Sequence, residues 1–159
     1  MAAYIKFDGV DGEAQDASHK NWSDILSFQQ GVHQPGSAAT GATRRRGDVI
    51  LDDIHVTKEL DKASPKIAES VCKGKVFPKV EIHLTASYTD AGRVTYYKYD
   101  LKNVLVTAYN IAGSGQSEDV PTEDFSLNFE EIKVTYTEAD NQGKSKGNVE
   151  YQWKVEQGE

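Results

Sequence analysis

Histidine and cysteine are the side chains best suited to acid–base, nucleophilic or metal chemistry near neutral pH. No two of the four histidines have the short spacing that a metal-binding helix needs; they are His19, His33, His55 and His83. Cys72 is the single cysteine, and one thiol can form neither an internal disulfide nor a thiolate cluster. We therefore expect no metal and no other cofactor. We expect His83 at the surface because it falls on the polar face of a predicted strand.

The acidic residues also fail to form a site. Residues 8–13 resemble the start of a calcium-binding loop, but Val10 and Gly12 stand where oxygen ligands are needed. Glu130 and Glu131 are adjacent, and neighbouring strand residues point to opposite faces, so the two carboxylates cannot flank one substrate. A hydrolase that uses either of them would need acids that converge in a cleft. The sequence predicts a protein that is not an enzyme.

Composition excludes two classes of partner. The chain has 159 residues with Lys+Arg 18 against Asp+Glu 25, a formal net charge of −7. A nucleic-acid-binding protein usually carries a basic face, so we expect no nucleic-acid partner. No run of apolar residues is long enough to span a bilayer, and the first residues lack the apolar segment of a signal peptide. We expect one domain over residues 1–159 and no insertion into membranes.

The elements that must position these side chains are mostly strands. Apolar and polar residues alternate with period two at 2–7, 24–30 and 49–58 and in about five further segments after residue 74. Ser64 as N-cap, Pro65 in the first turn and Gly74 after the last turn predict a helix over about residues 64–73. A change of parity at residues 130–131 predicts a bulge. The pattern predicts a mainly β fold, a small β-barrel of two sheets with one short flanking α-helix.

A long loop at residues 31–48 interrupts the strand pattern. Loops of this length in a compact domain are usually functional or disordered. The loop contains Gln34 and the only basic run of the chain, Arg44, Arg45 and Arg46. The run could bind an acidic partner chain or could simply keep the loop in water. We expect these four residues at contacts with another subunit.

Four blocks of residues resemble the Hcp (haemolysin-coregulated protein) family, which forms the inner tube of bacterial type VI secretion systems. The blocks are residues 4–13 with His19, Trp22, Asp24, residues 27–28 and 31–32; residues 61–66; Tyr99 with residues 101–106; and residues 121–123 with residues 127–129, Ile132, residues 136–137 and Trp153. Their order and spacing agree with the family over nearly the whole chain.

The resemblance implies homohexameric rings that stack into a tube and hold effectors in the lumen. It implies spike and sheath proteins as further partners. It also implies synthesis in the bacterial cytoplasm and export by the type VI machine without a signal peptide. With Phe28 directed inward, Ser27 and Gln29 face away from the core, and we expect them to line the lumen.

Three further positions are expected at the ends of the ring where rings stack. Asp90 and Gly92 belong to a predicted turn, and Glu156 follows the last predicted strand. An alternative function is a monomeric β-barrel that binds a small ligand. This alternative requires an open apolar cavity inside a single subunit, whereas a tube subunit requires two different adhesive surfaces.

Overall fold

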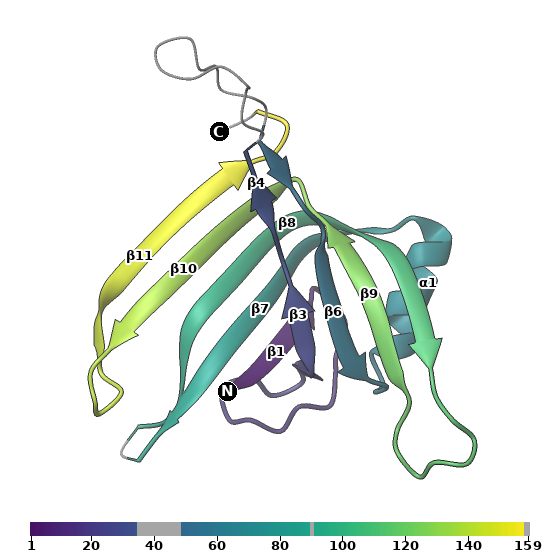
Figure 1. The fold of residues 1–159 in the computed structure, drawn as a ribbon, viewed down its shortest axis with the longest axis horizontal. Helices are drawn as coiled ribbons and strands as arrows, with labels where there is room; N and C mark the ends of the chain where they lie inside the picture. The colour runs from purple at the N-terminus through teal and green to yellow at the C-terminus, as the bar shows by residue number, and fades with distance from the viewer. Residues whose placement is uncertain (35–48, 90, 158–159) are drawn as a thin grey trace.

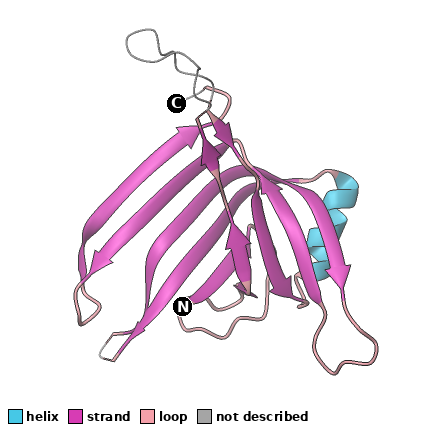
Figure 2. Ribbon diagram, in the orientation of Figure 1, coloured by secondary structure: helices cyan, strands magenta, loops and turns pink. Residues whose placement is uncertain are grey.

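The computed structural model describes residues 1–34, 49–89 and 91–157. Within these ranges the chain forms eleven strands and one helix (Figures 1 and 2). The elements are β1 (Ala2–Phe7), β2 (Ser23–Ile25), β3 (Ser27–Gln29), β4 (Val32–His33), β5 (Ile50–Leu51), β6 (Ile54–Glu59), α1 (Ser64–Lys73), β7 (Val76–Tyr88), β8 (Gly92–Ala112), β9 (Thr122–Asn128), β10 (Glu131–Ala139) and β11 (Ser145–Lys154). The expected mainly β fold with one short helix is confirmed.

The strands form two sheets, one of nine strands and one of two. The larger sheet follows the order β2-β1-β7-β8-β9-β6-β3, with β10 paired to β8 and β11 paired to β10, while β4 pairs with β5. Its path begins at β2 and ends at β3, which are separated only by Leu26. The N–H of Leu26 donates to the carbonyl of Thr57 in β6. The strand path is therefore a circuit that the chain itself joins at Leu26. The closed β-barrel that the sequence pattern favours remains a prediction.

The longest strand, β8, changes partners along its length. It pairs with β7 on one side; on the other side, residues 97–102 pair with β10 and residues 105–112 pair with β9. Between these two sections Asn103 has φ 51, a left-handed conformation that asparagine tolerates better than most residues. Its Nδ2 donates to Glu130 Oε2 at 2.8 Å, in the link between β9 and β10. The predicted bulge at residues 130–131 is thus wrong, because the parity change separates two strands.

The helix has the predicted bounds but a different N-cap residue. Ala63 is the N-cap residue and caps no backbone group with a side chain, so the expected capping role of Ser64 is wrong. Gly74 follows the helix with φ 61, and the N–H groups of Gly74 and Lys75 donate to the carbonyls of Val71 and Ser70. This left-handed C-cap is the one predicted from the glycine.

The centre of the strand circuit is filled by side chains. Phe7 packs against Phe77 with ring centroids 5.1 Å apart and against Phe125 with centroids 5.7 Å apart. All three are nearly inaccessible to solvent and belong to one continuous hydrophobic cluster. A barrel that binds a small ligand needs an open interior, so this packing disfavours the alternative function.

Candidate assembly surface

The sheet face that makes the core continues beyond the part that the chain covers. Strand register aligns Ile5, Ile82, Tyr99, Val134 and Tyr151 in one row across β1, β7, β8, β10 and β11. Their exposed fractions along the row are 1%, 0%, 7%, 4% and 46%. The apolar row thus runs from the core to open solvent without a change in its chemical character.

A neighbouring row repeats this gradient. It contains Ala3, Leu84, Tyr97, Tyr136 and Val149. Ala3 and Leu84 are buried and Tyr97 is half-buried, whereas Tyr136 and Val149 are 45% and 74% exposed. Two adjacent rows therefore leave a continuous apolar surface on the last two strands.

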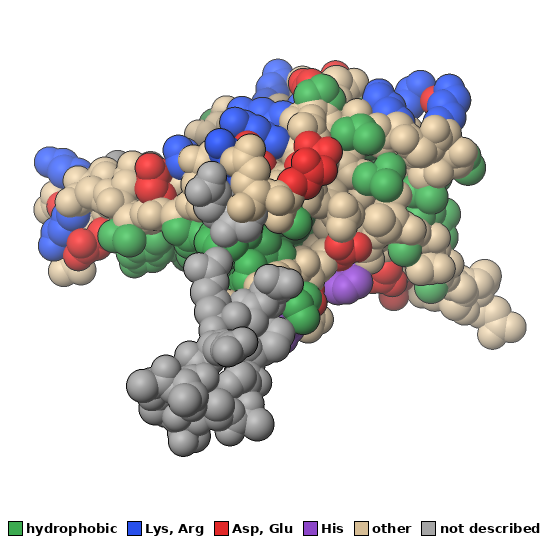
Figure 3. All heavy atoms as spheres, turned by 90° about the horizontal axis from the view of Figure 1, so that it is seen from above, with side chains coloured by type: hydrophobic (Ala, Val, Ile, Leu, Met, Phe, Trp, Pro, Cys, Tyr) green, Lys and Arg blue, Asp and Glu red, His purple; other side chains and the backbone are tan. Residues whose placement is uncertain are grey.

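We call β10 and β11, residues 131–154, the wing. In Figure 1 it is the left-hand arm of the molecule, and Figure 3 shows hydrophobic side chains gathered along one flank of that arm. The opposite face is polar, and one of its exposed ion pairs joins Lys133 Nζ to Glu150 Oε2 at 3.4 Å. Among the described strands β11 pairs only with β10, so its outer edge offers unpaired backbone N–H and C=O groups. An apolar face beside a free edge is the usual form of a surface that associates with another chain.

A groove lies between the wing and the small sheet of β4 and β5. Its lining residues are Val32, Gln34, Val49, Leu51, Tyr151 and Trp153. The indole N–H of Trp153 is buried and has no hydrogen-bond acceptor within the described part of the chain. Such a group normally finds a partner, so this buried donor beside the groove is unusual.

The residues predicted to line the lumen lie on a separate, polar surface. Ser27 and Gln29 are exposed on β3, while Phe28 between them packs against the core cluster, as the alternation predicts. In register they neighbour Thr57 and His55 of β6. Asp124 and Ser126 of β9 lie beside them in register, and Asn128 follows on the same face of that strand. The outward face of β3, β6 and β9 is therefore polar, in contrast to the apolar face of the wing.

The residues predicted at contacts between subunits are separated. Gln34 lines the groove beside the wing. Gly92, with φ 68, begins β8 at the tip of the β7–β8 hairpin, and Glu156 follows β11 at the opposite end of the wing (Figure 1). Asp90, Arg44, Arg45 and Arg46 lie outside the described residues.

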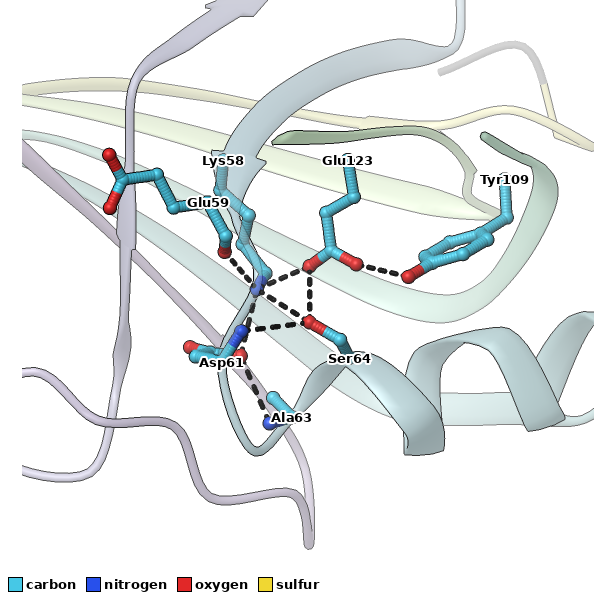
Figure 4. A network of polar contacts seen from close by, with 7 residues as sticks. All are labelled: Lys58, Glu59, Asp61, Ala63, Ser64, Tyr109 and Glu123. Atoms are coloured by element: carbon cyan, nitrogen blue, oxygen red, sulfur yellow. Dashed lines mark hydrogen bonds and ion pairs between the residues drawn. The ribbon is translucent and has the colours of Figure 1, made fainter. Parts of the chain in front are cut away.

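A buried polar network that sequence reasoning missed holds the helix against the strands (Figure 4). Lys58 of β6 and Glu123 of β9 are paired in register and form an ion pair, and both side chains are 0% exposed. Lys58 Nζ also donates to Asp61 Oδ1 at 2.8 Å, and Ser64 Oγ donates to Glu123 Oε1 at 2.9 Å. Tyr109 donates to the second oxygen of Glu123, and burial together with this carboxylate raises the pKa of Tyr109.

The network satisfies its charges internally and is structural. Every partner named above comes from the chain itself, and the ion pair lies where the first turn of α1 meets β6 and β9. The only feature of the sequence that points to this network is that Lys58 and Glu123 fall at inward-facing positions of their strands. No group of three or more His, Cys, Asp and Glu residues suited to a metal ion occurs among the described residues.

Comparison with known proteins decides the family. The model of the family "Type VI secretion system effector, Hcp" matches residues 4–136. The chain belongs to the Hcp family. It is 33% identical over 155 residues to protein Hcp1 of Pseudomonas aeruginosa, covering 97% of this chain and 94% of that protein.

Solved structures share the fold. A structure described as that of a type six secretion system protein superposes with a TM-score of 0.90 at 28% identity, covering 99% of this chain and 98% of that one. Hcp1 of Salmonella typhimurium superposes with a TM-score of 0.75 at 24% identity, covering 98% and 95% of the two chains, and supports the fold alone. Hcp proteins are structural and non-enzymatic components of type VI secretion, which confirms the expectation that this chain is not an enzyme. The described residues include no helix with the length and apolar character needed to cross a membrane.

Proposed function

We propose that this Hcp protein assembles into homohexameric rings that stack into the inner tube of a type VI secretion system. The tube holds effectors in its lumen and leaves the bacterial cytoplasm with them, driven by the sheath and led by the spike. The observation that carries the proposal is the apolar face of the wing, which continues the core but is left uncovered by the described residues. Membership of the Hcp family supports the same role.

The wing supplies one of the two different surfaces that a ring requires. A closed ring forms when a patch on each subunit binds a different patch on the next. The exposed apolar area of Val149 and Tyr151 and the unpaired edge of β11 suit such a contact.

The remaining surfaces fit the other parts of the proposal. Ser27 and Gln29 lie on a polar face distinct from the wing, which suits a water-filled lumen that holds proteins reversibly. Gly92 lies at the tip of the β7–β8 hairpin and Glu156 follows the far end of β11, so the two positions suit the two faces of a stacking ring. We assign Gln34, Asp90 and residues 44–46 to contacts between subunits or rings.

The mass of the assembly in solution tests this proposal. Native mass spectrometry of the unmodified chain should give a six-subunit species. The double variant Val149→Lys, Tyr151→Lys places two charges on the apolar face and should give monomers that remain folded. Gln152→Lys adds a charge to the opposite face of the same strand and should still give hexamers. Monomers of the unmodified chain at high concentration, or hexamers of the double variant, would contradict the proposed interface.

A further inference from the structure

Residues 8–22, which we call the cover segment, lie over the outer face of β1 and β7. His19 from this segment stacks on Tyr4 of β1 with ring centroids 4.5 Å apart. Trp22 packs on His83 of β7 with centroids 4.5 Å apart. The side chains of His19 and His83 are 3% and 13% exposed, so the expectation of a surface position for His83 is wrong.

The two histidines form a row of polar contacts that ends in a carboxylate on each side. His19 Nδ1 lies 2.7 Å from Asp16 Oδ2, and His19 Nε2 lies 2.9 Å from His83 Nδ1. His83 Nε2 lies 3.5 Å from Glu81 Oε2. The hydrogen bond from His19 holds the pKa of Asp16 below its usual range, and His83 and Lys79 lower the pKa of Glu81 to about 2. The carboxylates of Asp16 and Glu81, which end this row of contacts, are therefore charged acceptors near neutral pH.

The number of protons on the four ring nitrogens follows from these partners. A carboxylate only accepts, so the outer nitrogens, Nδ1 of His19 and Nε2 of His83, each carry a proton. The two nitrogens that face each other can share only one proton between them, because one must donate and the other must accept. Three protons on four nitrogens satisfy all three contacts, and the pair then carries one positive charge.

A fourth proton destroys this arrangement. Two N–H groups would then point at each other across 2.9 Å, and two positive rings would repel in a nearly closed site. The hydroxyl of Thr95, 3.5 Å from His19 Nε2, cannot replace the acceptor at that distance. The surrounding residues do not simply neutralise the added positive charge, because both acidic and basic side chains face the histidine pair. The ionisable groups around it are Tyr4, Lys6, Asp11, Asp16, Asp24, Lys79, Glu81, Arg93 and Lys98.

We propose that the His19–His83 pair is an acid-sensitive latch that releases the cover segment from β1 and β7 when both imidazoles are protonated. Few other hydrogen bonds join the segment to these strands, among them Asp8 N–H to the carbonyl of Lys79 and Lys6 Nζ to the carbonyls of Val10 and Asn21. Inside the segment, Gly12 N–H donates to the carbonyl of Asn21 and Ala14 N–H to the carbonyl of Trp22, and these bonds lose their support when the segment leaves the sheet. Release exposes Tyr4 and the outer face of the sheet inside a single subunit. The latch is thus independent of ring assembly, and its failure would leave the proposed function untouched.

Hydrogen exchange measured on the whole chain tests the latch. Protection factors of the Gly12, Ala14 and Trp22 amides, each referred to the unfolded chain at the same pH, should fall about tenfold between about pH 7.5 and about pH 5.0. The amide of Ile82 should keep its protection, because the strands do not open. Constant protection of the cover segment over this range would overturn the latch.

Two variants separate the latch from general acid destabilisation. His83→Gln keeps a donor and an acceptor but cannot take up a proton, so protection of the cover segment should no longer depend on pH in this range. His33→Gln alters an exposed histidine paired with Asp52 and should leave the pH dependence intact. An equal loss of protection in His83→Gln would contradict the proposal.

Proton counting on the wild-type rings provides a test that needs no variant. Nitrogen NMR of the two imidazoles should show three protonated ring nitrogens of the four while the cover segment is protected, and four only when the segment is released. Two fully protonated rings in a chain whose cover segment is still protected would exclude the latch.

Discussion

We call all strands of the large sheet except β10 and β11 its covered end. The covered end and the wing present the same face of the sheet to different surroundings. Ile82 and Tyr151 belong to one register row, yet Ile82 is 0% exposed and Tyr151 is 46% exposed. Residues of β3, β6 and β9 complete the hydrophobic cluster over the covered end, whereas none of these strands pairs with β10 or β11. Apolar alternation along a strand therefore predicts that a face is buried, but it does not say which chain buries it.

Ion pairs in the two regions also differ in their exposure to solvent. The Lys58–Glu123 pair of the covered end is excluded from water, while the Lys133–Glu150 pair of the wing has side chains 42% and 51% exposed. A buried charge left without its partner is costly, whereas an exposed charge is solvated by water. The comparison between the regions can therefore be tested with matched substitutions.

Removing the buried carboxylate should have the largest effect. Glu123→Ala leaves Lys58 buried with a single carboxylate partner, Asp61, and should lower the free energy of unfolding by about 3–5 kcal/mol. Glu150→Ala breaks the exposed pair of the wing and should cost about 0–1 kcal/mol. Denaturant unfolding of both variants measures the difference. Equal losses would mean that the two regions are not distinguished by burial.

Truncation within one row should give the next largest effect. Ile82→Ala removes buried methyl groups and leaves a cavity, which should lower the free energy of unfolding of the subunit by about 2–5 kcal/mol. Tyr151→Ala in the same row should cost the isolated subunit less than about 1 kcal/mol, because much of the ring is already in water. Unfolding measured under conditions that keep the chain monomeric checks this. A loss for Tyr151→Ala as large as that for Ile82→Ala would show that the wing is covered within its own subunit.

The junction between the two regions should respond to a smaller degree. Asn103 has φ 51, so Asn103→Val forces a β-branched residue into the left-handed region and should cost about 1–2 kcal/mol. Asn103→Gly fits this conformation and should cost less, although it also loses the hydrogen bond to Glu130. Thermal unfolding compares the two variants. If valine were tolerated as well as glycine, the change of pairing partners along β8 would not depend on this backbone conformation.

The smallest expected effect concerns the polar side of the covered end. His83 and Lys79 lower the pKa of Glu81 to about 2 in the folded chain, below the range of an unfolded glutamate. The stabilisation is therefore present above about pH 4.5 and is lost as the pH falls towards 2. Glu81→Gln should lose less stability than the unmodified chain over this range, as measured by denaturant unfolding at each pH. Parallel pH profiles would contradict this role of Glu81.

Local patterns in the sequence were sufficient for the elements that depend on neighbouring residues. Pro65 and Gly74 fixed the helix, and the alternation around Phe28 placed Ser27 and Gln29 on the exposed side of β3. These features follow from backbone conformation and from the period of a strand.

Features that depend on partners distant in the sequence could not be predicted. Lys58 and Glu123 read as ordinary charged strand residues until register placed them opposite each other. His83 has a polar strand pattern, and only the cover segment, more than sixty residues earlier in the chain, buries it. The apolar character of the wing was visible in the alternation of Val149, Tyr151 and Trp153, but its exposure depends on which strands lie opposite.

The position of the wing in the chain has a consequence for synthesis. Translation proceeds from the N-terminus, so β10 and β11 leave the ribosome after β1, β6, β7 and β9, whose residues supply much of the core. A nascent chain that ends before β10 lacks the apolar rows formed by Tyr136, Val149 and Tyr151. The proposed interface is therefore completed only when the strands beneath it are available to fold, which would limit association between unfinished chains.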